Sequence, residues 1–243
     1  VQDPLLMRRA LEYADGLGIT LAQHCEVERL TEGAVMHEGA CCSRLGLPGW
    51  PSIAEELMLH RDIELVRLTG VGMHFLHLST AKSVELVRAA KADGLPITAE
   101  ATPHHFSLTD ERLETYDALY KVNPPLRTPD DLAAIRAGLA DGTIDAIATD
   151  HAPHAPETKE RPLDQAPPGM LGLETALGVS LASLDMELAD VVAALSWKPA
   201  AIAGVADRRG RPIAPGERAN LAVFDPHDVW GGVPAKLASK SRS

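Results

Sequence analysis

Short apolar runs alternate along the chain with longer stretches in which apolar residues recur at helical spacing. The helical stretches carry capping residues: Asp3 and Pro4 open the first stretch and Gly16 is expected to close it. Helices are predicted over residues 3–16, 52–69, 81–92, 129–139, 169–183, 186–195 and 199–204. Strands are predicted over the apolar runs at 19–24, 73–78, 96–102 and 144–149.

The repeated order of strand and helix predicts an α/β fold with a parallel sheet and right-handed crossovers. Four βα units make half of an eight-stranded barrel, so we expect residues 1–205 to form the C-terminal half of a TIM-type (β/α)8 barrel. Because the first residue is Val1 and not Met, we expect further strands to be encoded upstream. In residues 206–243, turn residues flank a short strand predicted over 219–225, which indicates a small β element outside the barrel.

Composition and charge narrow the class of protein. The chain has 243 residues, 45% of them hydrophobic and 23% charged, as is typical of globular domains. The formal net charge of -11 disfavours nucleic acid and anionic membranes as partners, because both bind basic surfaces, while a small anionic substrate still fits. No run approaches the roughly twenty apolar residues of a membrane span. With Cys25, Cys41 and Cys42 expected to be free thiols, we expect a cytoplasmic protein.

Three predicted strands end in side chains that commonly bind metal ions. His24, His77 and Asp150 each follow a short apolar run. In a parallel β/α barrel the carboxyl ends of the strands meet at the active-site mouth, and imidazole with carboxylate suits zinc or a similar divalent ion. Taken alone, a histidine at a strand end is more often a polar residue satisfied by hydrogen bonds. Three such strand ends within one run of barrel units favour a metal site.

Other histidines compete for a place in this site. His104 and His105 follow the third predicted strand, and because a proline precedes them a structural role fits them as well as ligation does. His74 lies three residues before His77, so we expect it on the opposite face of the strand as a packed or surface histidine. His151 follows the predicted ligand of the last strand and is left without an assigned role.

Two loops are candidates for substrate contacts. Residues 121–127 contain two consecutive prolines, which stiffen the chain and would help Asn123 or Arg127 to hold a substrate amide or carboxylate. An ordinary Pro-Pro loop is the alternative. Residues 166–170 precede a predicted helix, where backbone amides can face a ligand, although this signal is weak on its own.

Six motifs, in this order and spacing, carry a resemblance to a known family. They are Gln23-His-Cys-Glu26, His77-Leu-Ser-Thr80, Thr102-Pro-His-His105, Asn123-Pro-Pro-Leu-Arg127, Ala148-Thr-Asp-His-Ala-Pro-His154 and Pro168-Gly-Met-Leu-Gly-Leu-Glu-Thr175. Together they resemble class I dihydroorotase of the amidohydrolase superfamily, from the first helix to the terminal Ser-Lys-Ser-Arg. Asp-His-Ala-Pro-His joined to Asn-Pro-Pro-Leu-Arg is the most specific part.

The resemblance implies a zinc-dependent (β/α)8 barrel that interconverts N-carbamoyl-L-aspartate and L-dihydroorotate in pyrimidine synthesis, with one or two zinc ions per subunit. By motif, His24 and His77 are implied as zinc ligands, and Asp150 as a ligand that also acts as general base. Substrate contacts are implied for Asn123, His154, Pro168 and Gly169. Residues 206–243 would belong to the small β-sandwich domain of the superfamily.

The sequence departs from the family pattern in one respect. The family's His-x-His-x-Arg motif on the first strand and a bridging acidic ligand do not occur in these residues, and we expect them upstream of Val1. We therefore expect residues 1–243 alone to hold metal poorly and to be inactive.

Two alternative functions stay open. One is a related cyclic-amide hydrolase, such as an allantoinase or a dihydropyrimidinase. The other is a noncatalytic dihydroorotase-like scaffold for aspartate transcarbamoylase. Beside the small-molecule substrate, a second copy of the chain and aspartate transcarbamoylase are the partners to consider.

Overall fold

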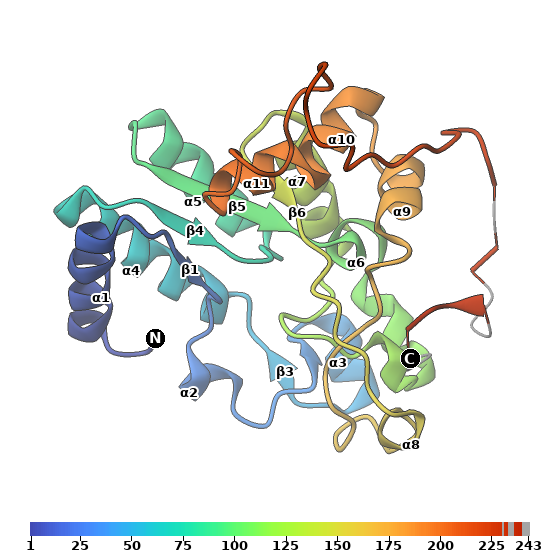
Figure 1. The fold of residues 1–243 in the computed structure, drawn as a ribbon. Coiled ribbons are helices and arrows are strands. Elements are labelled where there is room, and N and C mark those ends of the chain that lie inside the picture. Colours follow the sequence, from blue (N-terminus) through green and yellow to red (C-terminus); the bar gives the residue numbers. More distant parts are fainter. Residues whose placement is uncertain (230, 233–235, 240–243) are drawn as a thin grey trace.

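The computed structural model describes residues 1–229, 231–232 and 236–239, and a parallel sheet with the strand order β1-β4-β5-β6 lies at its centre (Figure 1). The strands are β1 Leu21–Gln23, β4 Met73–Phe75, β5 Ile97–Ala101 and β6 Ala146–Ile147. Each lies within a predicted strand, and each neighbouring pair runs parallel. The predicted α/β order is therefore confirmed, with strands shorter than the apolar runs that contain them.

Helix α1 Pro4–Leu17 precedes the first strand. Helices α4 Ile53–Thr69, α5 Ala81–Ala92 and α7 Pro129–Ala140 return the chain between the strands. Asp3 caps α1 by accepting a hydrogen bond from the backbone N–H of Leu6 at 2.7 Å, and Thr80 caps α5. The first helix continues through Gly16 and ends at Gly18, whose φ of 65° gives the left-handed cap that favours glycine.

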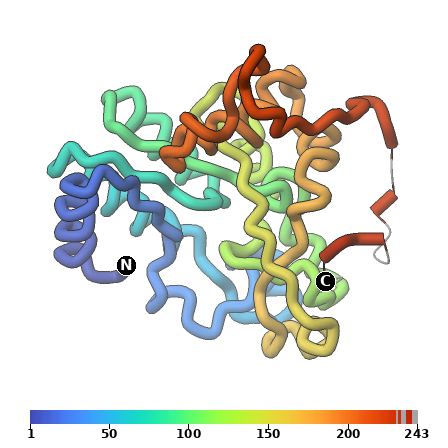
Figure 2. Tube along the Cα trace, in the orientation of Figure 1, coloured from blue at the N-terminus to red at the C-terminus, as the bar shows by residue number. Residues whose placement is uncertain are grey.

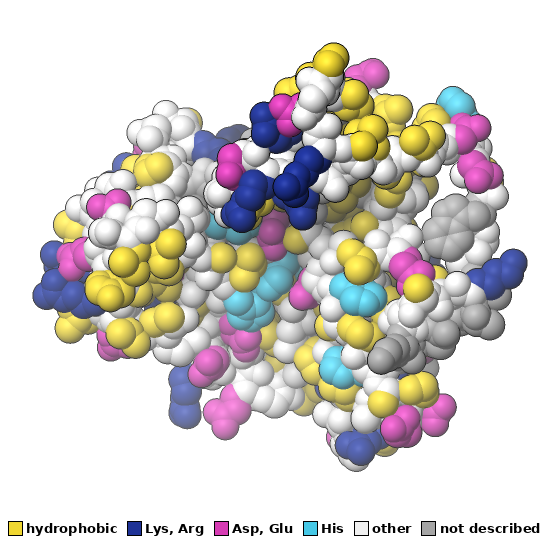
Figure 3. Space-filling view, viewed as in Figure 1, with side chains coloured by type: hydrophobic (Ala, Val, Ile, Leu, Met, Phe, Trp, Pro, Cys, Tyr) yellow, Lys and Arg dark blue, Asp and Glu magenta, His cyan; other side chains and the backbone are white. Residues whose placement is uncertain are grey.

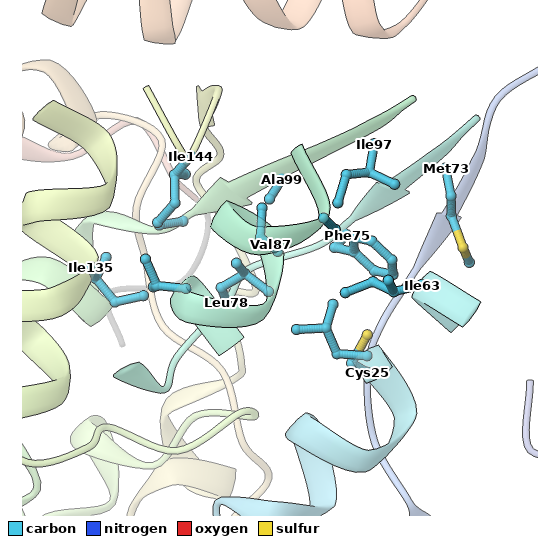
Figure 4. Close-up of a cluster of buried hydrophobic side chains, with 14 of the residues drawn as sticks. Cys25, Ile63, Met73, Phe75, Leu78, Val87, Ile97, Ala99, Ile135 and Ile144 are labelled. Atoms are coloured by element: carbon cyan, nitrogen blue, oxygen red, sulfur yellow. The ribbon is translucent and has the colours of Figure 1, made fainter. Parts of the chain in front are cut away.

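The main apolar core fills the space between one face of the sheet and these helices (Figure 4). The register pairs Met73 with Ile97 and Phe75 with Ala99, so these alternate positions point to the same side. Ile63 of α4 and side chains of α5 and α7 complete the cluster. Burial of this face fixes the register, because a shift by one residue would turn every apolar side chain away from the helices.

The opposite face of the same strands carries polar side chains. Nδ1 of His74 lies 2.8 Å from Oγ1 of Thr98, and its Nε2 lies 3.0 Å from a carboxylate oxygen of Glu100. His74 is 5% exposed, which makes it a packed histidine, one of the two predicted alternatives.

Residues 27–51 form a segment that the sequence pattern did not predict. It contains α2 Glu28–Thr31, β2 Met36–His37, α3 Ala40–Leu45 and β3 Gly49–Trp50, with β2 and β3 paired in parallel. This segment packs on the 3-10 helices η1 Asp110–Thr115 and η2 Ala118–Tyr120. A second apolar cluster joins them through residues such as Met36, Cys42 and Leu113. Cys25, Cys41 and Cys42 are free and buried, as expected.

The helices after β6 are short. They are α8 Pro156–Lys159, α9 Ala176–Ser183, α10 Leu188–Leu195 and α11 Trp197–Ile202, and another short helix, α6 Pro103–Ser107, follows β5. The helix predicted from residue 169 begins only at Ala176, because Gly169 has a φ of 145° and Gly172 lies against the backbone oxygen of Thr149. No helix in the described part of the chain is long and apolar enough to cross a membrane.

The tail after α11 runs past α10 and α9 as an irregular trace (Figure 2). The strand predicted over residues 219–225 is wrong: these residues have no regular structure, and the side chain of Val223 is 97% exposed. A strand needs a paired neighbour, and the described residues place none beside this segment.

Candidate active site

The rings of His24 and His77 converge just beyond the ends of β1 and β4. Nδ1 of His24 lies 2.9 Å from Nε2 of His77, and the rings meet edge to face with centroids 4.7 Å apart. The parallel register explains this approach, because Gln23 is level with Phe75 and both strands end at the same edge of the sheet. Histidine and acidic side chains gather near the middle of the face shown in Figure 3.

Glu26 holds the other ring nitrogen of His24. Its Oε2 lies 2.8 Å from His24 Nε2, and Thr31 donates its hydroxyl to the second carboxylate oxygen. Burial raises the pKa of Glu26, but the hydrogen bonds from His24 and Thr31 outweigh it and leave that pKa below its ordinary value. A carboxylate only accepts, so the proton of His24 resides on Nε2 and the lone pair of Nδ1 faces His77.

His77 and Asp150 share an unusual backbone conformation. Their φ angles are 31° and 43°, in the left-handed region that histidine and aspartate tolerate better than most residues. Burial and the neighbouring His24 lower the pKa of His77, whereas the Asp150 carboxylate raises it. Asp150 therefore lies within electrostatic range of His77.

Two imidazole nitrogens that face each other are suitable donors for zinc, which takes histidine nitrogen at about 2.0–2.1 Å. In the described residues, no group of three or more His, Cys, Asp or Glu side chains is placed to hold a metal ion. His24 and His77 thus fit part of a metal centre. The assignment of Asp150 as a further ligand stays a prediction.

His104 and His105 are buried in α6, next to this site. Nδ1 of His105 lies 2.7 Å from the Thr102 hydroxyl, and its Nε2 donates to the backbone oxygen of Pro124 at 3.0 Å. His105 therefore has the structural role that was one of its two alternatives. Burial, with a smaller effect of His77, lowers the pKa of His104 to about 3, so its imidazole is neutral at physiological pH.

Arg127 is a buried residue that links three segments of the chain by hydrogen bonds. It is 3% exposed and donates to the Ser79 hydroxyl at 3.1 Å, to the Trp50 backbone oxygen at 2.9 Å and to Nδ1 of His37 at 3.1 Å. Burial, and then the Arg127 charge, lower the pKa of His37 to about 4, which keeps this acceptor neutral. The 121–127 loop was predicted either to hold substrate through Asn123 or Arg127 or to be an ordinary Pro-Pro loop. Because the Arg127 side chain is buried and bonded within the protein, the structure disfavours it as a substrate ligand.

The residues predicted to contact substrate lie in neighbouring loops. His154 Nε2 donates to the Pro168 backbone oxygen at 2.8 Å. A Cβ on Gly169 would lie 2.6 Å from that nitrogen, and the φ of 145° also favours glycine. The backbone N–H of Gly169 donates to the Lys121 oxygen at 2.8 Å, which places this loop beside the segment that contains Asn123.

His151, which the sequence left unassigned, is a backbone acceptor. Its Nδ1 accepts hydrogen bonds from the backbone N–H groups of Gly172 and Leu173, both at 3.2 Å. Nδ1 must be unprotonated to accept, so His151 is held in one tautomer and fixes the loop that precedes α9.

Sequence reasoning missed Glu55. Its carboxylate accepts from the Ser79 N–H at 3.0 Å and the Thr80 N–H at 3.3 Å, and the Ser79 hydroxyl donates to it as well. Glu55 is 2% exposed and holds the turn directly after His77. An acidic residue in the first turn of a helix is already explained by the helix dipole, so the sequence offered no second signal.

A cleft of about 1610 Å³ lies between the end of β6, helices α9 to α11 and residues 205–224. Neither His24 nor His77 lines it. The candidate site is therefore defined by converging side chains and not by cleft size.

Comparison with known proteins decides the family. The amidohydrolase family pattern matches residues 3–241. The chain belongs to the amidohydrolase family. Among curated relatives, the dihydroorotase of Mycobacterium tuberculosis is 51% identical over 245 aligned positions, which cover 99% of this chain and 57% of that protein. The dihydroorotase of Streptomyces coelicolor is 49% identical over 247 positions, covering 100% and 58%. The chain spans just over half the length of these relatives.

Solved structures show the same family fold. A D-hydantoinase (dihydropyrimidinase) from Thermus sp. superposes with a TM-score of 0.72 and 28% sequence identity, covering 88% of this chain and 49% of that one. The α/β fold of this amidohydrolase chain thus corresponds to part of a hydantoinase structure.

Proposed function

We propose that the chain forms part of a dihydroorotase, which interconverts N-carbamoyl-L-aspartate and L-dihydroorotate. The observation that carries the proposal is the approach of His24 Nδ1 to His77 Nε2 at adjacent strand ends, in a chain 51% identical to a dihydroorotase. The lower identity of 28% to a hydantoinase favours dihydroorotate over the rings of the related cyclic-amide hydrolases.

In this proposal residues 1–205 supply four βα units of a TIM-type (β/α)8 barrel. The parallel order β1-β4-β5-β6 supports it, as does the coverage of about half of a hydantoinase chain, 49%. Residues 206–243, of which 230, 233–235 and 240–243 lie outside the described residues, would then be a segment of the small β-sandwich domain.

His24 and His77 would hold zinc, one or two ions per subunit, together with Asp150. Zinc, when bound, supplies a Lewis acid that polarises a carbonyl group and lowers the pKa of a nearby water. Two observations support this assignment. The hydrogen bond to Glu26 leaves the lone pair of His24 Nδ1 available, and the Asp150 carboxylate lies near His77.

The side chains of this chain would then manage substrate and protons. In hydrolysis, the Asp150 carboxylate takes a proton from the attacking water while the oxygen of that water forms a bond to the ring carbonyl carbon. Asp150 returns that proton to the ring nitrogen as the carbon–nitrogen bond breaks, so Asp150 ends in its starting state. The second proton of the water is released when the new carboxyl group of the product ionises. Asn123, His154 and the backbone at Pro168 and Gly169 would orient the substrate's carboxylate and ring amides.

The test is a comparison of substrates with the protein at its full encoded length. We expect turnover of dihydroorotate and, in reverse, of carbamoyl aspartate, with hydantoin and allantoin turned over at least about a hundred-fold more slowly. Preference for hydantoin or allantoin would reassign the protein to another cyclic-amide hydrolase.

Zinc analysis separates the enzyme from a noncatalytic scaffold. We expect stoichiometric zinc in the active protein and its loss on chelation. A folded protein without zinc or turnover that still binds aspartate transcarbamoylase would support the scaffold.

In our proposal the enzyme works in cytoplasmic pyrimidine synthesis, as a homo-oligomer or with aspartate transcarbamoylase. Size-exclusion chromatography with and without that partner tests the association.

A further inference from the structure

Two buried lysines lie behind the loop that we propose to contact substrate. Lys121 follows η2 and Lys159 is the last residue of α8, and they are 7% and 5% exposed. Lysine is rarely buried without a carboxylate partner. In the described residues the hydrogen-bond partners of both ammonium groups are backbone oxygens and not carboxylates.

The two ammonium groups bind one loop at several points. Lys159 Nζ donates to the Pro167 oxygen at 3.0 Å and to the Lys121 oxygen at 3.3 Å. Lys121 Nζ donates to the Leu163 oxygen at 2.7 Å and lies 3.5 Å from the Asp164 oxygen. The loop is thus attached to Lys121 at its beginning and to Lys159 near its end.

The Lys121 carbonyl joins this loop to the neighbouring segment. It accepts from Lys159 Nζ and also from the backbone N–H of Gly169 at 2.8 Å. Asn123 is two positions further along the same extended segment, and the Pro168 carbonyl accepts from His154. One backbone oxygen therefore connects the two loops that carry the proposed substrate contacts.

This arrangement is costly for a purely structural role. Burial, and then the positive charge of Lys121, lower the pKa of Lys159 to about 8, which shows that its charged form is poorly solvated here. Apolar residues could fill the same space, since Leu163 and Ala166 of this loop already pack into the second apolar cluster. An apolar side chain could not bind the Pro167 and Lys121 oxygens and so would not fix the backbone of Gly169.

We infer that Lys159 and Lys121 are positioning residues that hold the Pro168-Gly169 loop against the Asn123 segment and thereby set the geometry of the substrate contacts. The inference rests on the proposed function of these loops. Neither lysine needs to touch the substrate, because each acts through backbone atoms of the loop.

The test uses Lys159→Met in the full-length protein, with Lys159→Arg as the conservative variant. Lys82→Met is the matched control, because Lys82 is exposed on α5 and pairs only with Glu85 in the described structure. Hydrogen exchange of the peptide covering residues 163–170, KM and kcat for dihydroorotate, and zinc content are measured for each.

We expect Lys159→Met to speed amide exchange in this peptide about ten-fold and to raise KM about ten-fold, with kcat within about three-fold and zinc content unchanged. Lys159→Arg should recover most of both effects, and Lys82→Met should match the wild type. Unchanged exchange and KM in Lys159→Met would overturn the inference. So would a loss of kcat with unchanged KM and exchange.

A second variant keeps the test decisive if Lys159→Met does not fold. Lys121→Met removes the bonds to Leu163 and Asp164, and we expect faster exchange in the same peptide. Equal exchange in Lys121→Met and wild type would also contradict the inference. If the wild-type protein does not turn over dihydroorotate, the proposed function fails, while the exchange measurement still tests whether the lysines hold the loop.

Discussion

Nδ1 of His24 and Nε2 of His77 lie 2.9 Å apart, although 53 residues separate them in the sequence. Two parallel strands with matched ends bring them together, and Glu26 determines which nitrogen of His24 is available. Each component of this arrangement can be altered separately.

Glu26→Gln should weaken zinc binding by about ten- to a hundred-fold in the full-length protein, because a neutral amide no longer secures the proton of His24 on Nε2. Competition with a chromophoric zinc chelator measures the affinity. Glu28→Gln, at an exposed position of α2, is the control and should bind zinc as the wild type does. Equal affinity in Glu26→Gln would show that Glu26 has no part in orienting His24.

Asp150→Asn should lower kcat for dihydroorotate by about 10²–10⁴-fold, because the amide cannot carry the proton from water to the ring nitrogen. Zinc content, measured on the same sample, separates loss of proton transfer from loss of metal. Asp130→Asn, exposed at the start of α7, should keep wild-type kcat. Near-normal turnover by Asp150→Asn would remove Asp150 from the proposed mechanism.

Gly169→Ala should destabilise the protein by about 1–3 kcal/mol and raise KM, because its Cβ would meet His154 Nε2 at 2.6 Å and its φ of 145° is unfavourable for alanine. Gly16→Ala is the matched control. Nothing lies within 4 Å of its Cβ inside helix α1, so it should stabilise by about 0.5–1 kcal/mol. Urea unfolding and steady-state kinetics measure both. Similar stability of the two variants would contradict the packing at Gly169.

Because His37 is buried in its neutral form, the free energy of unfolding should fall in mild acid. Its pKa is lowered from 6.5 to about 4, so between these values the unfolded chain binds a proton that the folded chain does not. The stabilising contribution is therefore complete above pH 6.5 and is lost as the pH falls to about 4, by at most about 3 kcal/mol.

His37→Asn keeps an acceptor for Arg127 but does not titrate, so its unfolding free energy should depend less on pH between 6.5 and 4 than that of the wild type. His60→Asn, at an exposed position of α4, should retain the wild-type slope. Denaturant unfolding across this pH range measures the slopes, and parallel curves for His37→Asn and wild type would contradict the prediction.

Residues 1–243 expressed alone should bind zinc weakly and show no turnover, because His24 and His77 form a pair and no group of three or more potential ligands is placed to hold a metal ion in the described residues. Equilibrium dialysis with zinc and an assay with dihydroorotate check this. Robust turnover would show that the chain carries a complete site.

Local patterns predicted the order of the main elements. The helix over residues 81–92 coincides with α5, because its caps and its apolar spacing are written in adjacent residues. Strands β2 and β3 escaped prediction because two residues are too few to show a period. The prediction of a strand at 219–225 was wrong for a different reason. The local pattern of a strand is present there, but the described residues contain no neighbouring strand to pair with it.

Site residues could be predicted where the type of side chain and its place at a strand end were enough to indicate its role. His24 and His77 are strong ligand types at strand ends, and the structure brings them together. The role of Arg127 depended on Ser79, 48 residues away, and on His37, 90 residues away, so sequence spacing could not distinguish a buried linking residue from a substrate ligand. Lys159 was missed because a lysine is expected in solvent unless tertiary structure buries it.

The left-handed backbone at His77 and Asp150 restricts how this site can be redesigned. A position with positive φ accepts glycine, asparagine, aspartate or histidine with less strain than most residues, and it resists β-branched and bulky residues most strongly. An engineer who wants to change metal preference at these two strand ends therefore obtains imidazole and short carboxylate donors with the least backbone strain.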